Sequence, residues 1–410
     1  MNHPAMVQNV PPRSPNPLVE SLPELKDFSL VLGGPLYQLL RKAHLDDDVE
    51  SHLRRRILWI CGIIWLPLLV LCAIKGTLMG GIQVPFLVDA ETHARFLVAV
   101  PLMILAEYFV HLRMRGIVAQ FVERKLIPEG AMERFRETII NAMKWRNSMA
   151  AELVLVGIVF TVGYFLRSNY FALEVSTWYA TTGAEGATLT LPGYWFTWVS
   201  TPLVQFLIVR WLFRLAIWGR FLWQVSRIEL DLIPIHPDRN GGLGFLGGSA
   251  YAFSPLLAAF SAMVAGLVAS RIFHEGASLA DFKLEIVALV VLGMLLVLGP
   301  LTVFAPQILA AKRRGLREYG AFAADYTRDF HRRWLLSADH DGEPLLGTGD
   351  IQSLADLGNS FAVIKEMNAV PFSRDMFLQL IWATLVPFVP LVFTMIPLEE
   401  LLDRIIGAAL

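Results

Sequence analysis

Residues 54–74 read RRRILWICGIIWLPLLVLCAI. Three arginines are followed at once by an apolar run, Ile57–Ile74. As a helix this run is long enough to cross the hydrocarbon core of a bilayer, which is about 30 Å thick. Because arginines are enriched at the cytoplasmic ends of membrane spans, the stretch also predicts a cytoplasmic N-terminus. The sequence therefore predicts an integral membrane protein whose chain first enters the bilayer after Arg56.

Further apolar segments of comparable length recur along the chain. They lie at about 96–110, 150–166, 195–211, 250–270, 286–308 and 376–397. Together with Ile57–Ile74 they give roughly seven crossings by the usual length criterion. We therefore predict an all-α integral membrane protein, a bundle of about seven transmembrane helices with a helical cytoplasmic layer.

The composition agrees with this fold class and narrows the partners. Of the 410 residues, 55% are hydrophobic and 17% are charged. Soluble domains average about 45–50% apolar and about 25% charged residues, so the chain is shifted toward the membrane class. Its net charge of -1 lacks the basic excess of chains that bind DNA or RNA. The lipid bilayer is the expected partner, and no nucleic acid is.

The distribution of Lys and Arg between the loops predicts the orientation of the chain. The segments at 112–148, 218–249 and 309–375 are rich in basic residues, whereas the alternate loops hold few. By the positive-inside rule this bias gives a cytoplasmic N-terminus, three helical loops in the cytoplasm and a periplasmic C-terminus.

The predicted bundle covers residues 54–397. Residues 1–53 before it are predicted to form a cytoplasmic N-terminal arm and a short helix. The first 30 residues are rich in proline and poor in large apolar residues, which is typical of a flexible or extended arm. Residues 398–410 are predicted to form a short amphipathic tail at the outer surface.

Two patterns predict helices beyond the membrane. The turn Ile127-Pro128-Glu129-Gly130 separates two helical stretches. After the sixth span an apolar stripe recurs every three or four residues: Leu316, Tyr319, Phe322, Tyr326, Phe330 and Trp334. The stripe predicts that the sixth span continues into the cytoplasm as an amphipathic helix. Packing against a neighbouring cytoplasmic helix is the preferred interpretation, and docking of a partner is the alternative.

The loop between the fourth and fifth spans contains HPDRNGGLGFLGG, residues 236–248. Exposed backbone N–H groups at a glycine-rich helix start can bind anions, and such starts line substrate sites in transporters. His236 and Asp238 are candidates for binding a cation or relaying protons. The preferred interpretation is a structured turn in which Asp238 accepts hydrogen bonds from backbone N–H groups. In this interpretation the glycines of the stretch permit close packing of the helices. They are Gly241, Gly242 and Gly244.

Polar residues inside the predicted spans form a second candidate group. They are Glu107 and His111 on the second span, Glu152 on the third, and Gln205, Arg210 and Arg214 on the fourth. Ionisable side chains within a bilayer cost several kcal/mol and usually face the bundle interior or a water-filled cavity. All the ionisable members lie toward the cytoplasmic side. This placement predicts a polar vestibule that opens to the cytoplasm.

The loop residues His236, Asp238 and Arg239 would complete that vestibule. The alternative is that the carboxylates pair with nearby arginines, while Arg210 and Arg214 extend to the lipid headgroups. For these two arginines, extension to the headgroups is the preferred interpretation.

These observations favour a channel or transporter for an ion or small solute. A rival hypothesis is a scaffold or sensor that docks a partner through its cytoplasmic helices, and a third is a membrane-embedded enzyme. Glu107 and His111 could form a metal site with His236 and Asp238. However, the sequence has no HExxH motif, no GxSxG motif and no paired metal-ligand spacing. We therefore predict no catalytic residue, no metal site and no cofactor.

Four stretches carry a resemblance to known proteins. They are His236–Leu246, Leu346–Leu357, Met367–Ser373 and Pro397–Leu402. In these stretches the chain resembles a group of uncharacterised bacterial multi-pass inner-membrane proteins that carry an HPDxxGGLGFL cytoplasmic motif. The resemblance implies a bacterial inner membrane and brings no activity with it. The sequence is compatible with a homo-oligomer.

Overall fold

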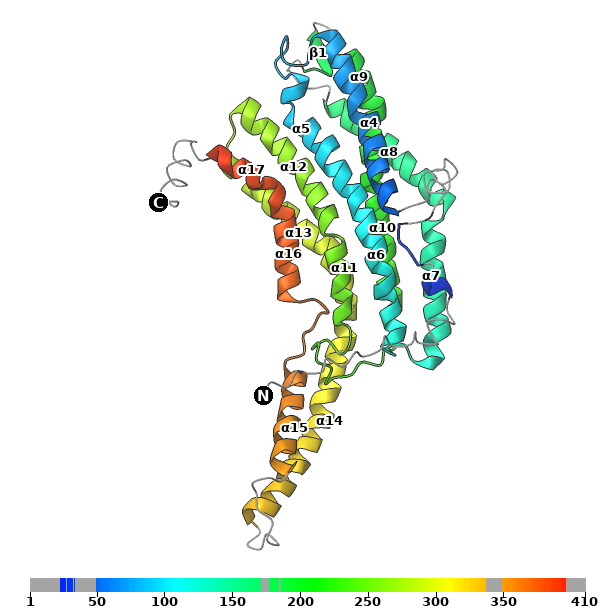
Figure 1. Ribbon diagram of the computed structural model, residues 1–410, viewed down its shortest axis with the longest axis vertical. Helices are drawn as coiled ribbons and strands as arrows, with labels where there is room; N and C mark the ends of the chain where they lie inside the picture. The colour runs from blue at the N-terminus through cyan, green and yellow to red at the C-terminus, as the bar shows by residue number, and fades with distance from the viewer. Residues whose placement is uncertain are drawn as a thin grey trace, which may run out of the picture.

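The computed structural model describes residues 23–26, 28–31, 33, 49–170, 177–183, 186–336 and 349–395. It is an elongated helical bundle from which one helical hairpin projects (Figure 1). Within the described residues, 6 helical runs are long and apolar enough to span a membrane, and 7 if two helices bent by 46° at their junction count as one span. The predicted fold class is confirmed.

The elements follow one another along the chain with few strands. The helices are α2 (Pro23–Lys26), α4 (Val49–Lys75), α5 (Ala90–His93), α6 (Val100–Glu123), α7 (Met132–Arg146), α8 (Met149–Tyr170), α9 (Leu191–Trp195), α10 (Thr201–Val225), α11 (Gly247–Ala252), α12 (Ser254–Glu275), α13 (Lys283–Leu298), α14 (Ala305–His331), α15 (Gly349–Lys365), α16 (Arg374–Leu385) and α17 (Val389–Val392). The strands β1 (Ala180–Gly183) and β2 (Gly186–Leu189) pair antiparallel.

Several spans are longer than the apolar segments that predict them. The second, fourth and sixth are continuous helical runs: Ala90–Glu123 with 34 residues, Leu191–Val225 with 35 and Leu279–Leu336 with 58. Because a bilayer core needs only about 20 helical residues, each run extends beyond the membrane. The apolar pattern thus marks the membrane-embedded part of a longer rod.

Prolines lie where these long runs change pitch. A π-helical turn, Ala94–Ala99, comes just before Pro101, and a second one, Phe196–Ser200, comes just before Pro202. Proline lacks the N–H donor, and its ring clashes with the carbonyl four residues earlier. The helix therefore leaves the regular α pattern at that point without ending.

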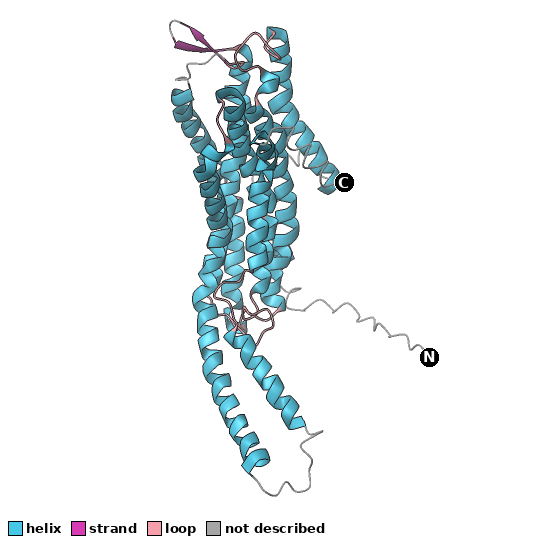
Figure 2. Cartoon of the chain, turned by 90° about the vertical axis from the view of Figure 1, so that its left-hand side faces the viewer, coloured by secondary structure: helices cyan, strands magenta, loops and turns pink. Residues whose placement is uncertain are grey.

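The loops gather at two opposite ends of the bundle. At the end that carries α14 and α15, called here the hairpin end, the backbone N–H of Asp231 donates to the carbonyl of Leu126 at 2.9 Å. There Lys312 Nζ also donates to the carbonyl of Met367 at 2.9 Å. At the opposite end, called the β end, Trp178 Nε1 donates to Asp89 Oδ2 at 2.8 Å. Figure 2 shows the strands at one end and the long helical hairpin at the other.

The apolar stripe of residues 316–334 lies on the projecting hairpin. α14 continues through a π-helical turn, Arg332–Leu336, and packs along α15. Tyr326 donates its hydroxyl to the carbonyl of Asp350 at 3.2 Å, and Trp334 Nε1 donates to Asp350 Oδ2 at 2.9 Å. The preferred interpretation, packing against a neighbouring helix, is therefore confirmed, although Phe322 remains 59% exposed.

The expectation of a flexible or extended arm over residues 1–30 is wrong for its described part. Leu25, Phe28 and Leu30 are buried, and the ring of Phe28 lies 5.5 Å from that of Phe221. These few apolar side chains suffice because they enter a space between α6, α7 and α10, which a count of prolines cannot reveal. The hydrogen bond from Arg136 to Glu24 also lowers the pKa of that carboxyl.

Three predicted features lie outside the described residues. They are the first part of the N-terminal arm, most of the short helix predicted before residue 49, and the amphipathic tail at 398–410.

Candidate functional site

A group of charged side chains is buried where α4, α6 and α10 meet. We call Arg56, Glu107, Arg210 and Arg214 the arginine cluster. Arg214 Nη1 donates to Glu107 Oε1 at 2.6 Å, and both side chains are almost fully buried. The second carboxylate oxygen, Oε2, lies 2.6 Å from Arg56 Nη1. One carboxylate therefore joins three helices.

Helical periodicity brings Arg56 into this cluster. It lies four residues before Ile60 on the face of α4 that goes on to bury Ile64, Leu68 and Cys72. Arg54 and Arg55, its neighbours in the chain, are exposed. Reading the three arginines only as a topology signal overlooks Arg56, although its spacing from the buried stripe places it on the inner face.

Arg214 is held from two further directions. Its guanidinium carbon lies 5.0 Å from the centroid of the Trp211 ring. Trp211 Nε1 in turn donates to the carbonyl of Met103 on α6 at 3.2 Å. A cation above an indole face in a desolvated site is stabilised by about 2 kcal/mol. The position of Arg214 is thus fixed by packing as well as by its ion pair.

Arg210 differs from the other members of the cluster. Its side chain lies within electrostatic range of Arg214, Glu107, Arg56 and Glu152, which come from α10, α6, α4 and α8. It is only 7% exposed. Among the described residues it forms no hydrogen bond, and no carboxylate oxygen lies within the 4.0 Å of an ion pair.

These positions decide between the two interpretations of the intramembrane charges. The expectation that Arg210 and Arg214 extend to lipid headgroups is wrong, since both are buried in the bundle. The alternative in which Glu107 pairs with nearby arginines is confirmed. The reason is that α10 continues past Arg214 to Val225, so these arginines lie inside a longer helical bundle and not at its edge.

Gln205 and Glu152 flank the cluster differently. Gln205 precedes Arg210 by five residues, which is about 7.5 Å along α10. Its Oε1 faces α8 so closely that a Cβ on Gly163 would lie 3.3 Å away. That oxygen is buried and has no hydrogen-bond partner among the described residues. Glu152 acts on Arg210 through space.

His111 links the cluster to the N-terminal segment. It lies one turn beyond Glu107 on α6, and its Nδ1 is 3.0 Å from Ser29 Oγ. Arg146 Nη1 donates to the carbonyl of Ser29 at 2.6 Å, and Arg146 is close enough to Arg214 for electrostatic repulsion. Ser29 and Arg146 belong to this site and are absent from the sequence prediction, because only the fold brings them to α6.

The HPDRNGG stretch forms a compact turn. The carboxylate of Asp238 accepts hydrogen bonds from the backbone N–H groups of Asn240 at 2.9 Å, Gly242 at 3.1 Å and Gly244 at 2.8 Å. His236 Nδ1 lies 2.9 Å from Asp238 Oδ1. Burial by itself raises the pKa of the Asp238 carboxyl, but these hydrogen bonds and His236 together hold the pKa below its usual value.

The glycines of this turn have conformational reasons. Gly241 and Gly242 have φ values of 66° and 102°, in the region that favours glycine, and a Cβ on Gly244 would lie 3.0 Å from Asp238 Oδ2. Arg239 also has a positive φ of 56°, and its guanidinium pairs at 3.0 Å with Glu366 at the surface. The contacts fit the structured-turn interpretation.

The turn and the arginine cluster are separate sites. Arg124 at the end of α6 donates to the carbonyl of Gly242 at 3.3 Å. Arg124 lies 17 residues (124 minus 107) beyond Glu107 on nearly continuous helix, which is about 25 Å. The predicted vestibule therefore does not unite His236, Asp238 and Arg239 with the buried arginines. The same distance prevents His236 and Asp238 from sharing a metal ion with Glu107.

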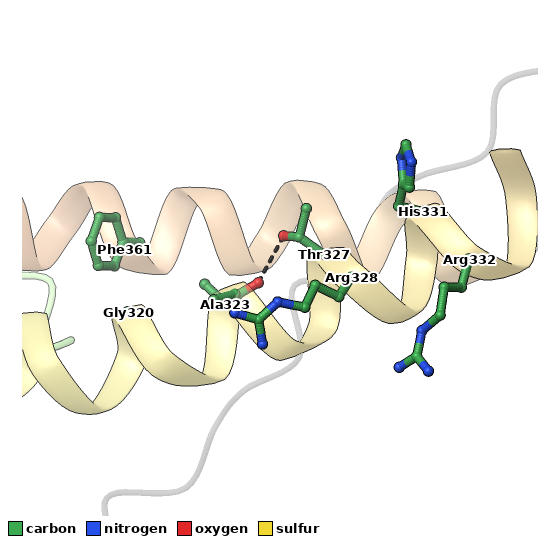
Figure 3. A pocket seen from close by; sticks show the side chains of 8 residues that line it. Gly320, Ala323, Thr327, Arg328, His331, Arg332 and Phe361 are labelled. Atoms are coloured by element: carbon green, nitrogen blue, oxygen red, sulfur yellow. Dashed lines mark hydrogen bonds between the residues drawn. The ribbon is translucent and has the colours of Figure 1, made fainter. Parts of the chain in front are cut away.

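A third feature is an open groove on the projecting hairpin. Figure 3 shows it between α14 and α15, with Phe361 on one side and Thr327, Arg328 and His331 on the other. Its volume is about 740 Å³. Arg328 is paired with Asp325 on its own helix. Across the described residues, no group of three or more His, Cys, Asp or Glu side chains is arranged to hold a metal ion.

Comparison with protein-family models, curated proteins and solved structures finds no match. The residues of this chain therefore carry the functional assignment alone.

Proposed function

We propose that this protein is a channel or transporter for an ion or small solute, and that its permeation path passes the arginine cluster. The observation that carries the proposal is the cluster itself, buried midway along two of the longest membrane-spanning runs, Ala90–Glu123 and Leu191–Val225. Burying a charge in such a place costs several kcal/mol. Purely structural packing of α4, α6 and α10 needs no such charges, because apolar side chains fill such interfaces at least as stably.

The arginine cluster is also suited to binding and releasing a charged substrate during transport. Glu107 is shared between Arg56 and Arg214, so a charged substrate can exchange with one ion-pair partner of the site. Such exchange keeps each buried charge partnered during passage, which lowers the barrier that an isolated ion would meet in a low-dielectric interior. Because its helices are long and apolar enough to cross a bilayer, the protein is suited to connect the two compartments that a membrane separates.

Flux through proteoliposomes tests this function. Purified protein in liposomes is expected to conduct at least one member of a panel of monovalent ions and small solutes, at rates above empty liposomes, at two pH values. The double variant Glu107→Gln/Arg214→Gln removes the charges as a pair and should lose that flux. Arg239→Gln, at the surface and far from the cluster, is the matched control and should keep it. Rates equal to empty liposomes for the whole panel would reject transport.

The proposed membrane is the bacterial inner membrane, with the hairpin end in the cytoplasm and the C-terminus in the periplasm. The basic bias of the segments that meet at the hairpin end supports this orientation. Alkaline phosphatase fused after Leu410 is expected to be active, because it needs the oxidising periplasm to form its disulfides. The same enzyme inserted between residues 336 and 349 should be inactive. The opposite pair of results would reverse the orientation.

Docking of a partner is the second candidate function. The observation that favours it is the hairpin of α14 and α15, which projects beyond the bundle and carries the open groove at Phe361 (Figures 1 and 3). The protein would be assigned to this second function, docking of a partner, on two results. It conducts no ion or solute, and the variant Phe361→Ser/Phe322→Ser no longer performs the function of the wild type in cells.

A further inference from the structure

The arginine cluster contains more positive charge than its carboxylates balance. Both oxygens of Glu107 are engaged, one with Arg214 and one with Arg56. Arg210 interacts electrostatically with two further guanidinium groups, Arg214 and Arg56, and with two carboxylates, Glu107 and Glu152. Among the described residues, three positive charges, including Arg210 itself, thus face two negative ones, and Arg146 close to Arg214 adds a fourth positive charge.

Two sets of donors are left over. The Arg210 side chain belongs to a residue that is only 7% exposed and makes no hydrogen bond or ion pair with any described residue, although its nitrogen atoms are not among the fully buried atoms that lack a partner. The Nε–H group of Arg56 is also buried without a hydrogen-bond partner among the described residues. Buried donors of this kind are expensive unless an acceptor meets them. Both sets can be satisfied by an acceptor, and a negatively charged acceptor forms the stronger hydrogen bonds with guanidinium groups.

We propose that the arginine cluster is an anion site, in which Arg210 and Arg56 Nε bind a small, singly charged anion such as chloride, nitrate or formate. This inference rests on the proposed function and names its substrate class. A bound anion offsets part of the surplus of positive charge described above. A small anion is proposed because Glu107, Arg210 and Arg214 are each less than one-tenth exposed, which leaves little room for a phospholipid headgroup.

The start of α4 provides an approach for such an anion. Arg56 is the most exposed of the three residues that form the ion pairs of the arginine cluster, with 29% of its side chain accessible. Arg54 and Arg55, its neighbours in the chain, line an open groove of about 550 Å³ together with Leu58 and Trp59 on the exposed face of α4, and Arg56 is not among the residues that line it. The positive charge of Arg54 and Arg55 near the start of α4 raises the local concentration of anions.

Thermal unfolding in detergent tests the site without any transport measurement. The melting temperature is measured in sodium gluconate and in sodium chloride, nitrate and formate at one ionic strength. Because an anion that binds only the folded state stabilises it by mass action, the three small anions are expected to raise the melting temperature by several degrees over gluconate. Replacing sodium by potassium should change nothing. Equal melting temperatures in all four salts would overturn the proposal.

Two variants separate an anion-binding Arg210 from a structural one. Arg210→Gln is expected to lose the anion-dependent rise and, in gluconate, to melt no lower than the wild type, because it removes an unpaired buried charge. Arg239→Gln is expected to keep the full rise. If Arg210→Gln instead lowers the melting temperature equally in every salt, Arg210 holds the helices together and the proposal fails.

Further measurements distinguish a bound lipid headgroup from a small anion, and they separate the anion site from the proposed transport function. If phosphatidylglycerol added in gluconate reproduces the rise while phosphatidylcholine does not, and chloride then adds nothing, the occupant is a lipid headgroup and the small-anion assignment is overturned. Cation flux with no anion-dependent stabilisation would reject the anion site and leave transport standing. Anion-dependent stabilisation without flux of any ion would keep the anion site and reject transport.

Discussion

Replacing Glu107 by alanine is expected to lower the free energy of unfolding by about 3–5 kcal/mol, because it leaves buried guanidinium groups without their shared carboxylate. Arg214 would lose the partner of its 2.6 Å hydrogen bond, and Arg56 would lose its only ion pair among the described residues. Reversible unfolding in mixed detergent micelles, followed by circular dichroism, measures the loss.

The matched control is Glu366→Ala, which breaks an ion pair with Arg239 in which both side chains are 55% exposed. Exposed pairs contribute about 0–1 kcal/mol, so this variant should unfold almost as the wild type does. The double variant Glu107→Ala/Arg214→Ala should be less damaged than the two single losses added together, since Arg214 is no longer present as a buried cation without its carboxylate, although Arg56 still lacks its partner. If Glu107→Ala costs no more than Glu366→Ala, the cluster does not stabilise the fold through this carboxylate.

Asp238→Ala is expected to cost about 3 kcal/mol of folding stability, because three backbone N–H groups lose their common acceptor. The turn links the end of α6, through Arg124, to the start of α11, so its loss should loosen the hairpin end. The same unfolding titration measures the effect. Asp231→Ala, an exposed aspartate shortly before the turn, is the control and should unfold as the wild type does.

A flux measurement distinguishes a structural role of Asp238 from a role in the permeation path. Because the turn lies about 25 Å from Glu107 along α6, protein that folds with Asp238→Ala should retain the flux of the wild type. Selective loss of flux in a normally stable Asp238→Ala protein would show that the turn belongs to the permeation path after all.

The stabilising effect of Asp238 should also depend on pH with a defined sign. Its pKa is held below the usual value in the folded protein, so the folded state binds the proton less readily than the unfolded chain. The stability that the ionised carboxylate contributes is present above the ordinary aspartate pKa of about 3.9 and is lost as the pH falls through the lower, folded-state pKa. The gap in unfolding midpoint between wild type and Asp238→Asn should therefore narrow on acidification below about pH 4. A constant gap would contradict this.

Several features of the fold can be predicted from sequence because they depend on local patterns. Each apolar run long enough to cross a bilayer corresponds to a helix, since an unsatisfied backbone is costly in lipid and a helix satisfies its backbone groups within one continuous segment. The stripe from Leu316 to Trp334 likewise predicts both a continuing helix and its packing against a neighbour. The role of Asp238 in the turn follows from its position two residues before Asn240.

The candidate site could be predicted only in part. Glu107, Arg210 and Arg214 are recognisable because charges within apolar segments are costly wherever they occur. Their pairing is not, because a side chain's direction depends on which neighbour its helix meets. Thus two arginines expected at the headgroups are buried, and Arg56 turns from a topology signal into a partner of Glu107.

What the sequence by itself determined is the membrane class, the positions of the spans and which loops share an end of the bundle. Hydrophobic length and charge bias are sums over neighbouring residues, so they need no knowledge of the fold. Only the tertiary structure decided that Ser29 and Arg146 lie beside the arginine cluster, that Arg210 has no hydrogen-bond or ion-pair partner among the described residues, and that Asp238 lies in a separate site. Those facts depend on contacts between residues far apart in the chain, and such contacts exist only once the helices have packed.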